Sequence, residues 1–203
     1  MLLPLIFCLL AYLIGSLSSA IIICKSARLP DPRSQGSGNP GASNMLRLGG
    51  KGLASLVLLF DVVKGWLPVM LAKYLGMPLS VLAWIAFFAF LGHLFPIFFS
   101  FRGGKGVATA LGGLFALAWP IGLFALLVWI VILLSFRYIS LASISSALLT
   151  LFDAVYLLPA VAYLPILLIC ILLIIRHHSN IRRLIAGTEP QLNKSNIIKK
   201  LNH

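Results

Sequence analysis

The sequence predicts an all-α membrane protein with seven transmembrane helices. Hydrophobic residues make up 61% of its 203 residues, and only 10% are charged. The hydrophobic residues form runs close to the ~20 residues that a helix needs to cross the bilayer core. Short polar segments carry most of the 16 lysines and arginines, against four acidic residues. This distribution is typical of cytoplasmic loops between membrane helices, and it argues against a nucleic-acid partner.

The first three apolar runs each predict one span. Residues 2–24 form the first span, residues 52–74 the second and residues 79–99 the third. No basic segment precedes the first run, which is long enough to span, so a signal peptide is not expected. A polar loop of residues 25–51, rich in Gly, Pro, Ser and Asn, separates the first two spans and is expected to lie in the cytoplasm.

The next apolar run, residues 107–136, is too long for one span. As a single helix it would extend roughly 45 Å, well beyond the bilayer core. Trp119-Pro120 offers a break, and only with this break do the later basic residues fall on the same side as the earlier polar loops. We therefore expect spans at 107–118, 120–136, 139–156 and 158–175, an outside N-terminus, cytoplasmic loops at 25–51 and 100–106, and a cytoplasmic tail at 176–203. Residues 1–203 then form one integral membrane domain.

An anion-binding turn is predicted between the third and fourth spans. Gly103, Gly104 and Gly106 allow backbone N–H groups to converge, and Arg102 and Lys105 add positive charge. A helix is expected to begin at Val107, so that its first N–H groups point to the same place. The alternative is a close helix–helix turn whose lysine extends along the membrane surface.

A second candidate anion site lies in the loop between the first two spans. Residues 37–44 read SGNPGASN, where glycines around a proline predict a tight turn and the polar side chains can surround an oxyanion. A nearby arginine can add a bidentate contact. An ordinary turn that connects two spans is the alternative. Two spans separate this loop from the glycine turn, so both are expected on one membrane face. The candidates here are Ser37, Gly38, Asn39, Gly41, Asn44 and Arg47.

Two charged residues interrupt the second span. Asp61 and Lys64 are three residues apart, on one side of the predicted helix. Charges at this depth are costly unless they are paired or face water, so we expect both to face the interior of the helix bundle. A structural ion pair and a pair that shapes a ligand site both satisfy this condition. His93, in the third span, is expected to be a helix-contact residue rather than a catalyst.

Polar groups also mark the sixth span and the end of the seventh. Ser143 is the hydroxyl of the sixth span that we place in a site, whereas helix packing accounts for the neighbouring serines. His177 and Asn180 lie three residues apart, on one predicted helical face. A solvated basic tail that contacts anionic lipid is the alternative for this segment.

Several kinds of chemistry are excluded by the residues that are missing. The four carboxylates are scattered along the chain, which argues against a metal-dependent phosphotransfer site. A serine triad lacks its acid, and the three cysteines lack the spacing of metal ligands. The remaining site can hold phosphate-bearing ligands through charge and backbone N–H groups. A membrane transporter for an organic phosphate and a lipid-binding scaffold without catalysis are the other classes considered.

Four motifs occur in order over nearly the whole chain. They are SGNPGASN at 37–44, DVVKG at 61–65, GHLFPIFFSFRGGKGVAT at 92–109, and the segment 176–189 with its Arg-His, Asn-Ile and Gly-Thr-Glu groups. Together they resemble the bacterial membrane glycerol-3-phosphate acyltransferase family that uses acyl phosphate as donor. The resemblance implies transfer of an acyl group from acyl phosphate to the 1-hydroxyl of sn-glycerol 3-phosphate, which yields lysophosphatidic acid and phosphate without a metal or cofactor.

The resemblance also implies a setting for this reaction. The enzyme would be a seven-helix, multi-pass protein of the bacterial cytoplasmic (inner) membrane, with its active site facing the cytoplasm. Its partners would be acyl phosphate, glycerol 3-phosphate and membrane lipids. It would act as a monomer, functionally linked to the enzyme that makes acyl phosphate.

Residue roles carried over from the family fall on matching positions of this chain. Lys105, His177 and Asn180 would be catalytic. The substrate-binding residues would be Ser37, Gly38, Asn39, Gly41, Asn44, Arg47, Asp61, Lys64, Gly103, Gly104, Gly106, Thr109 and Ser143.

Three positions depart from the usual family pattern. Ser43 replaces a frequent threonine and Arg102 a frequent lysine, so the hydroxyl and the charge are kept. Ser18 stands where the first span often has proline, which leaves the local bend of the first helix open.

A direct displacement is the expected mechanism. The alcohol would attack the acyl phosphate carbonyl while Lys105 and the glycine turn stabilise charge on the departing phosphate. The proton could pass to His177 or to a phosphate oxygen of a substrate. We favour the phosphate, because no histidine has a carboxylate partner visible in the sequence.

Overall fold

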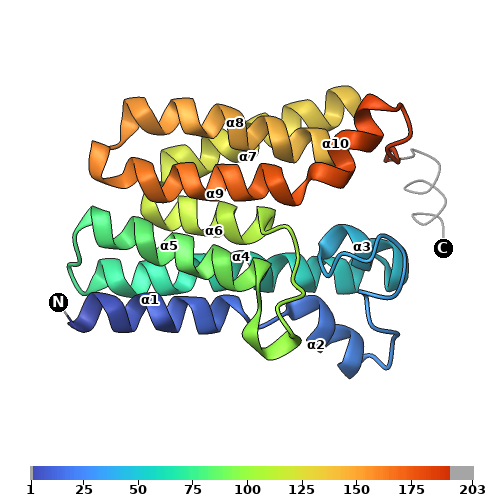
Figure 1. The fold of residues 1–203 in the computed structure, drawn as a ribbon, viewed down its shortest axis with the longest axis horizontal. Helices are drawn as coiled ribbons and strands as arrows, with labels where there is room; N and C mark the ends of the chain where they lie inside the picture. Colours follow the sequence, from blue (N-terminus) through green and yellow to red (C-terminus); the bar gives the residue numbers. More distant parts are fainter. Residues whose placement is uncertain (1, 193–203) are drawn as a thin grey trace.

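The computed structural model describes residues 2–192, and all regular secondary structure in this part of the chain is helical (Figure 1). Residues 193–203 of the predicted cytoplasmic tail lie outside the described residues. The helices are α1 (Leu2–Gly15), α2 (Ser19–Ser26), α3 (Ala42–Leu48), α4 (Gly50–Tyr74), α5 (Leu79–Leu94), η1 (Ile97–Phe99), α6 (Val107–Leu117), α7 (Trp119–Phe136), α8 (Ile139–Leu157), η2 (Ala160–Ala162), α9 (Tyr163–Arg176) and α10 (His178–Ile185).

The candidate membrane spans follow the predicted apolar runs. Within the described residues, α4, α7, α8 and α5 extended through η1 are each long and apolar enough to cross a membrane. Two bent pairs, α1 with α2 and η2–α9 with α10, can each supply one more span. The predicted break at Trp119-Pro120 is confirmed, because α6 ends at Leu117 and α7 begins at Trp119. At 11 residues, α6 is apolar but shorter than the helices that are long enough to cross a membrane by themselves.

The first predicted span, residues 2–24, is not one continuous helix. It bends by 41° between α1 and α2. The carbonyl of Leu17, freed at this break, accepts a hydrogen bond of 2.9 Å from Lys64 Nζ. An internal partner of this kind is what allows a helix to break at membrane depth. Ser18 therefore does not prevent the bend, although proline is absent there.

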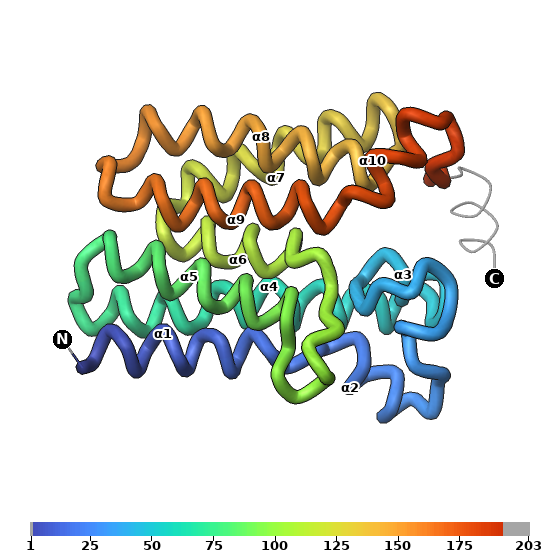
Figure 2. Tube along the Cα trace, in the orientation of Figure 1, coloured from blue at the N-terminus to red at the C-terminus, as the bar shows by residue number. Residues whose placement is uncertain are grey.

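The helices form two groups that meet along α6 (Figure 2). In one group, α1 packs on α5 and α4 packs on both α5 and α6. In the other, α7 packs on α8 and α8 on α9, which also contacts α5. The loop predicted at 25–51 contains the short helix α3, which packs on α4 and was not expected from the sequence.

Two glycines allow α4 and α6 to touch backbone to backbone. A Cβ atom on Gly65 would lie 2.0 Å from the Thr109 carbonyl oxygen, and one on Gly112 would lie 2.1 Å from the Val62 carbonyl oxygen. Small residues at such crossings are typical of membrane helix pairs, which associate through close packing.

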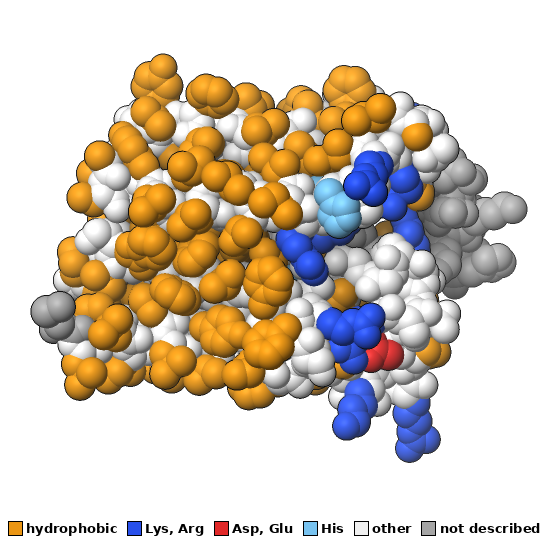
Figure 3. Space-filling model, viewed as in Figure 1, with side chains coloured by type: hydrophobic (Ala, Val, Ile, Leu, Met, Phe, Trp, Pro, Cys, Tyr) orange, Lys and Arg blue, Asp and Glu red, His pale blue; other side chains and the backbone are white. Residues whose placement is uncertain are grey.

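The surface separates apolar and basic regions. Figure 3 shows apolar side chains over most of the visible face and Lys and Arg side chains gathered at the end where α2, α3 and α10 lie. Many large apolar side chains are exposed, such as Leu134 at 73% and Phe152 at 67%. Exposed apolar surface of this extent indicates a membrane protein.

The α4–α6 contact yields a stability prediction. Gly112→Val should destabilise the fold by about 1–3 kcal/mol, because the added side chain forces two backbones apart. Gly52→Val on α4 is the matched control, since a Cβ there meets no atom within 4 Å. Thermal unfolding in detergent measures both. Equal midpoints for the two variants would show that the close approach contributes little to stability.

Candidate functional site

The glycine turn is held in place by two neighbouring segments. The Gly104 N–H donates to the His93 carbonyl at 3.2 Å. Arg176 Nη2 donates to the carbonyls of Gly103 at 2.8 Å and Gly104 at 3.0 Å. These contacts tie the turn to α5 on one side and to the end of α9 on the other.

Glycine is required at two positions of this turn. Gly106 has φ +80°, and a Cβ there would lie 2.4 Å from the Phe90 ring. At Gly104 a Cβ would lie 2.2 Å from His93 Nε2. A side chain at either position would push the turn away from α5. Gly104 and Gly106 are therefore needed for packing, whether or not the turn binds an anion.

Lys105 extends from the turn to the C-terminal helices. Its ammonium donates to Asn180 Oδ1, so the structure brings together two of the residues that the family resemblance marks as catalytic. Burial lowers the pKa of Lys105 to about 8, with Glu189 opposing the shift and Arg183 adding to it. Lys105 is therefore cationic at neutral pH, with its charge only partly compensated.

His177 lies at a bend and not within a continuous helix. The chain turns by 56° between α9 and α10, with His177 at the junction. His177 caps the start of α10, where its carbonyl accepts from the Ile181 N–H at 2.9 Å, and both His177 and Asn180 are buried. His177 is 3% exposed, and its Nδ1 lies 2.8 Å from the Leu173 carbonyl. Because a carbonyl only accepts, the neutral ring carries its proton on Nδ1 and leaves Nε2 as an acceptor. Burial lowers the pKa of His177 to about 4.

Glu189 is a member of this cluster that sequence reasoning missed. Its carboxylate accepts hydrogen bonds from Asn180 Nδ2 and Ser140 Oγ, each at 2.6 Å, and from Arg183 Nε at 2.7 Å. Burial would raise the pKa of Glu189, but these hydrogen bonds outweigh it and lower the pKa. The signal was the Gly-Thr-Glu group after α10, which was noted in the motif but given no role.

Ser143 lies one turn along α8 from Ser140. Its hydroxyl donates to the Ile139 carbonyl at 2.9 Å and accepts from Trp129 Nε1 at 3.1 Å. Ser143 is 3% exposed. The structure thus places it on the helix that contacts Glu189, and its contact with a ligand stays a prediction.

The first polar loop is organised by Asn44. Its Oδ1 accepts from the Ser37 N–H at 2.9 Å, and its Nδ2 donates to the carbonyls of Pro32 at 2.9 Å and Gln35 at 3.0 Å. Asn44 is 1% exposed, and the three contacts of its amide are with the backbone of the loop, so this side chain holds the loop in shape. Ser37 and Gly38 are exposed, Asn39 and Gly41 are half-buried, and Arg47 is exposed on α3. Arg47 lies close enough to contribute to the lowered pKa of Lys105.

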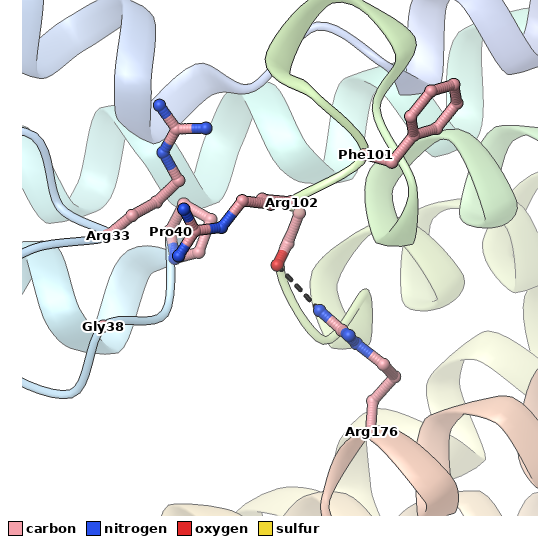
Figure 4. Close-up of a pocket in the computed structure, with 7 residues that line it drawn as sticks. Arg33, Gly38, Pro40, Phe101, Arg102 and Arg176 are labelled. Carbon is pink, nitrogen blue, oxygen red and sulfur yellow. Dashed lines mark hydrogen bonds between the residues drawn. The ribbon is translucent and has the colours of Figure 1, made fainter.

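A basic pocket joins the two glycine-containing loops (Figure 4). Its volume is about 250 Å³. Arg33, Arg102 and Arg176 reach it from three different segments. Arg102 is the arginine that the sequence placed beside the glycine turn, whereas Arg33 and Arg176 were given no site role from the sequence. Arg33 is partly neutralised by Asp31, at 2.7 Å. The pocket is lined by Arg33, Gly38, Pro40, Phe101, Arg102, Gly103 and Arg176.

Asp61 and Lys64 form a buried ion pair on α4. Lys64 Nζ lies 2.8 Å from Asp61 Oδ1, and both residues are almost fully buried. Asp61 Oδ1 also accepts from Ser19 Oγ and lies 3.5 Å from His93 Nδ1. Thr109 Oγ1 lies 3.3 Å from the same histidine nitrogen. The expected inward orientation of both charges is confirmed, and their contacts here are with other protein groups.

No group of three or more His, Cys, Asp or Glu side chains that could hold a metal ion occurs within residues 2–192. The Lys105 cluster combines an ammonium, an amide, a neutral imidazole and the Glu189 carboxylate, beside the backbone N–H groups of the glycine turn. Such a set can bind and neutralise phosphate oxygens.

Comparison with known proteins identifies close relatives. A family model described as glycerol-3-phosphate acyltransferase matches residues 5–187. A curated glycerol-3-phosphate acyltransferase of Vibrio campbellii is 47% identical over 98% of this chain and 97% of its own length. One from Methylobacillus flagellatus is 50% identical over 93% of this chain and 97% of its own length.

Two solved structures match the fold over nearly its whole length. Both are crystal structures of PlsY (YgiH), an integral membrane glycerol 3-phosphate acyltransferase, and each covers 96% of this chain and 98% of its own. The glycerol 3-phosphate form gives a TM-score of 0.91 at 39% identity. The lysophosphatidic acid form gives 0.88 at 38% identity.

The buried ion pair yields a second stability prediction. Asp61→Leu should destabilise the protein by about 3–5 kcal/mol, because it leaves the Lys64 ammonium buried without its carboxylate. The double variant Asp61→Leu/Lys64→Met removes both charges and should recover much of this loss. Denaturant unfolding in detergent measures the difference. A double variant that is less stable than Asp61→Leu would contradict this account.

Proposed function

The chain belongs to the glycerol-3-phosphate acyltransferase family, and on this premise we propose that it transfers an acyl group from acyl phosphate to the 1-hydroxyl of sn-glycerol 3-phosphate. The products are lysophosphatidic acid and inorganic phosphate. The observation that carries the proposal is the contact of Lys105, in a glycine turn, with Asn180, beside a basic pocket. Two phosphate-bearing substrates require positive charge of this kind.

The reaction proceeds by direct displacement. The glycerol 3-phosphate hydroxyl oxygen forms a bond to the acyl carbon, and the bond between that carbon and the bridging phosphate oxygen breaks. Lys105 and the N–H groups of the glycine turn stabilise negative charge on the departing phosphate. No covalent intermediate is needed, because the acyl phosphate is already activated.

The hydroxyl proton passes to a phosphate oxygen of a substrate. His177 is a poor base at neutral pH because burial lowers its pKa to about 4. Its unprotonated Nε2 can still accept a hydrogen bond from the hydroxyl and orient it. His177 thus positions the nucleophile while phosphate takes the proton.

Substrate contacts extend beyond the three residues that act on the reacting groups. The first loop and Arg47 face the same region as the glycine turn and contribute donors to the second phosphate. Asp61, Lys64 and Thr109 support the turn through His93, whose carbonyl accepts from the Gly104 N–H. The binding set is Ser37, Gly38, Asn39, Gly41, Asn44, Arg47, Asp61, Lys64, Gly103, Gly104, Gly106, Thr109 and Ser143, and Lys105, His177 and Asn180 act in catalysis.

The proposed membrane arrangement has seven spans over one domain, with the site at the cytoplasmic face of the bacterial inner membrane. The positive-inside rule supports this orientation, because the basic loops and the C-terminal segment then share the inner side. The two polar loops and the end of α9 meet at one pocket, which fits a site open to soluble glycerol 3-phosphate. One chain supplies the complete site and acts as a monomer, linked functionally to the enzyme that makes acyl phosphate.

Purified protein in detergent tests this function. With acyl phosphate and glycerol 3-phosphate, phosphate release and lysophosphatidic acid formation should be equal and should depend on both substrates. Lys105→Met should reduce turnover by at least about 100-fold, since it removes the charge at the departing phosphate. Lys51→Met, at an exposed lysine of α4, is the control and should retain activity. Glycerol 3-phosphate transport into vesicles without any turnover would favour a transporter instead.

The pKa of Lys105 predicts the alkaline limit of activity. The ammonium is present below pH 8 and is lost as the pH rises through about 8. The value of kcat/KM for glycerol 3-phosphate should therefore fall above about pH 8, with a slope of one proton. Neutral His177 gives no corresponding loss between pH 5 and 7. A profile that stays flat to pH 10 would mean that the charge on Lys105 is not needed.

A further inference from the structure

Glu189 lies at the centre of the Lys105 cluster, although no catalytic step described above uses it. Its side chain is 7% exposed. The donors to its carboxylate come from Ser140 on α8 and from Asn180 and Arg183 on α10. The carboxylate thus joins two helices directly beside the Asn180 amide that binds Lys105.

The backbone after α10 is shaped to bring Glu189 back to the site. Gly187 has φ +68°, a conformation that favours glycine. Its N–H donates to the Leu184 carbonyl at 3.2 Å, and the Thr188 N–H donates to the Arg183 carbonyl at 2.8 Å. This left-handed turn ends the helix and reverses the chain, so that the residue two positions later points inward.

The hydrogen bonds around Asn180 allow only one orientation of its amide. An ionised carboxylate only accepts, and an ammonium only donates. Asn180 therefore directs its NH₂ group to Glu189 and its oxygen to Lys105. A glutamine at 189 could donate to the Asn180 oxygen, which would turn the NH₂ group toward Lys105 and break that contact.

Glu189 is also the carboxylate that balances the charge of Lys105. It raises the pKa of the lysine, whereas the cationic groups nearby lower it. These cations come from α3, from the end of α9 and from α10, and a neutral histidine lies at the α9–α10 bend. The titratable and charged groups near Lys105 are Glu189, Arg183, Arg176, Arg47 and His177.

We propose that Glu189 is a positioning residue of the reaction: it locks the Asn180 amide so that its oxygen holds the Lys105 ammonium toward the substrate phosphate. The inference rests on the proposed acyl transfer, which requires that ammonium. Glu189 itself touches neither substrate. It acts through Asn180 by geometry and on Lys105 by charge.

Glu189→Gln separates this role from a purely structural one. The variant should lower kcat by about tenfold or more, because the amide is no longer held in one orientation. It should also shift the alkaline limb, meaning the fall of kcat/KM above about pH 8, to lower pH by about one unit. The loss of a nearby negative charge makes the Lys105 ammonium easier to deprotonate. Loss of a structural contact alone would reduce the amount of folded protein and leave that limb in place.

Two control variants complete the experiment. Asp153→Asn makes the same chemical change on α8, 13 residues from Ser140 or about 20 Å along the helix, and should leave both kcat and the limb unchanged. Ser140→Ala removes one donor but keeps the carboxylate on Asn180, so the limb should stay near pH 8. Thermal unfolding midpoints confirm folding of each variant.

The outcomes are distinct from those of the activity test. An inactive wild-type protein would contradict the proposed function. The positioning role alone would be overturned if the wild type is active and the Glu189→Gln variant folds, keeps its kcat and loses kcat/KM at the same alkaline pH as the wild type. Should Glu189→Gln fail to fold, Glu189→Asp decides: it keeps the charge and shortens the side chain, so the limb should remain near pH 8 while kcat falls. Unchanged kcat in that variant would overturn the proposal.

Discussion

The arrangement of the site depends on the glycine turn being anchored from two sides. On α5, the His93 carbonyl accepts a hydrogen bond from the Gly104 N–H of the turn. At the end of α9, Arg176 donates to two carbonyls of the turn. In a peptide unit the carbonyl and the N–H point in opposite directions, so the Gly104 carbonyl fixed toward Arg176 leaves the Lys105 N–H facing the other way. The Gly104 N–H is already bonded to the His93 carbonyl. Both helix groups must therefore pack correctly before an anion can meet the Lys105 N–H and ammonium together.

The turn is supported by a buried pair of opposite charges on α4. Asp61 and Lys64 neutralise each other, and the Lys64 ammonium also satisfies the carbonyl exposed by the break between α1 and α2. His93 connects this pair to the turn through its ring and its own carbonyl. The two expectations for the pair, a structural role and a role in shaping the site, are thus compatible. The pair supports the fold and the position of the turn at once.

The sequence predicted the parts of this site that depend on local pattern. Apolar run lengths located the helices, and glycine with lysine located the turn, because both signals lie within a few residues. The role of Glu189 depends on a left-handed turn at Gly187 and on a serine 49 residues away, a pairing that no local pattern contains. The three arginines of the basic pocket likewise come from distant segments. Tertiary contacts of this kind explain why the bend at His177 was also missed.

The central claim is that the site works by holding two phosphate-bearing substrates together, without a covalent acyl-enzyme. Initial velocities measured with glycerol 3-phosphate varied at several fixed acyl phosphate concentrations test it most directly. The account predicts intersecting lines in a double-reciprocal plot, as expected when both substrates are bound before product leaves. Parallel lines, together with an acylated protein trapped in the absence of glycerol 3-phosphate, would contradict it.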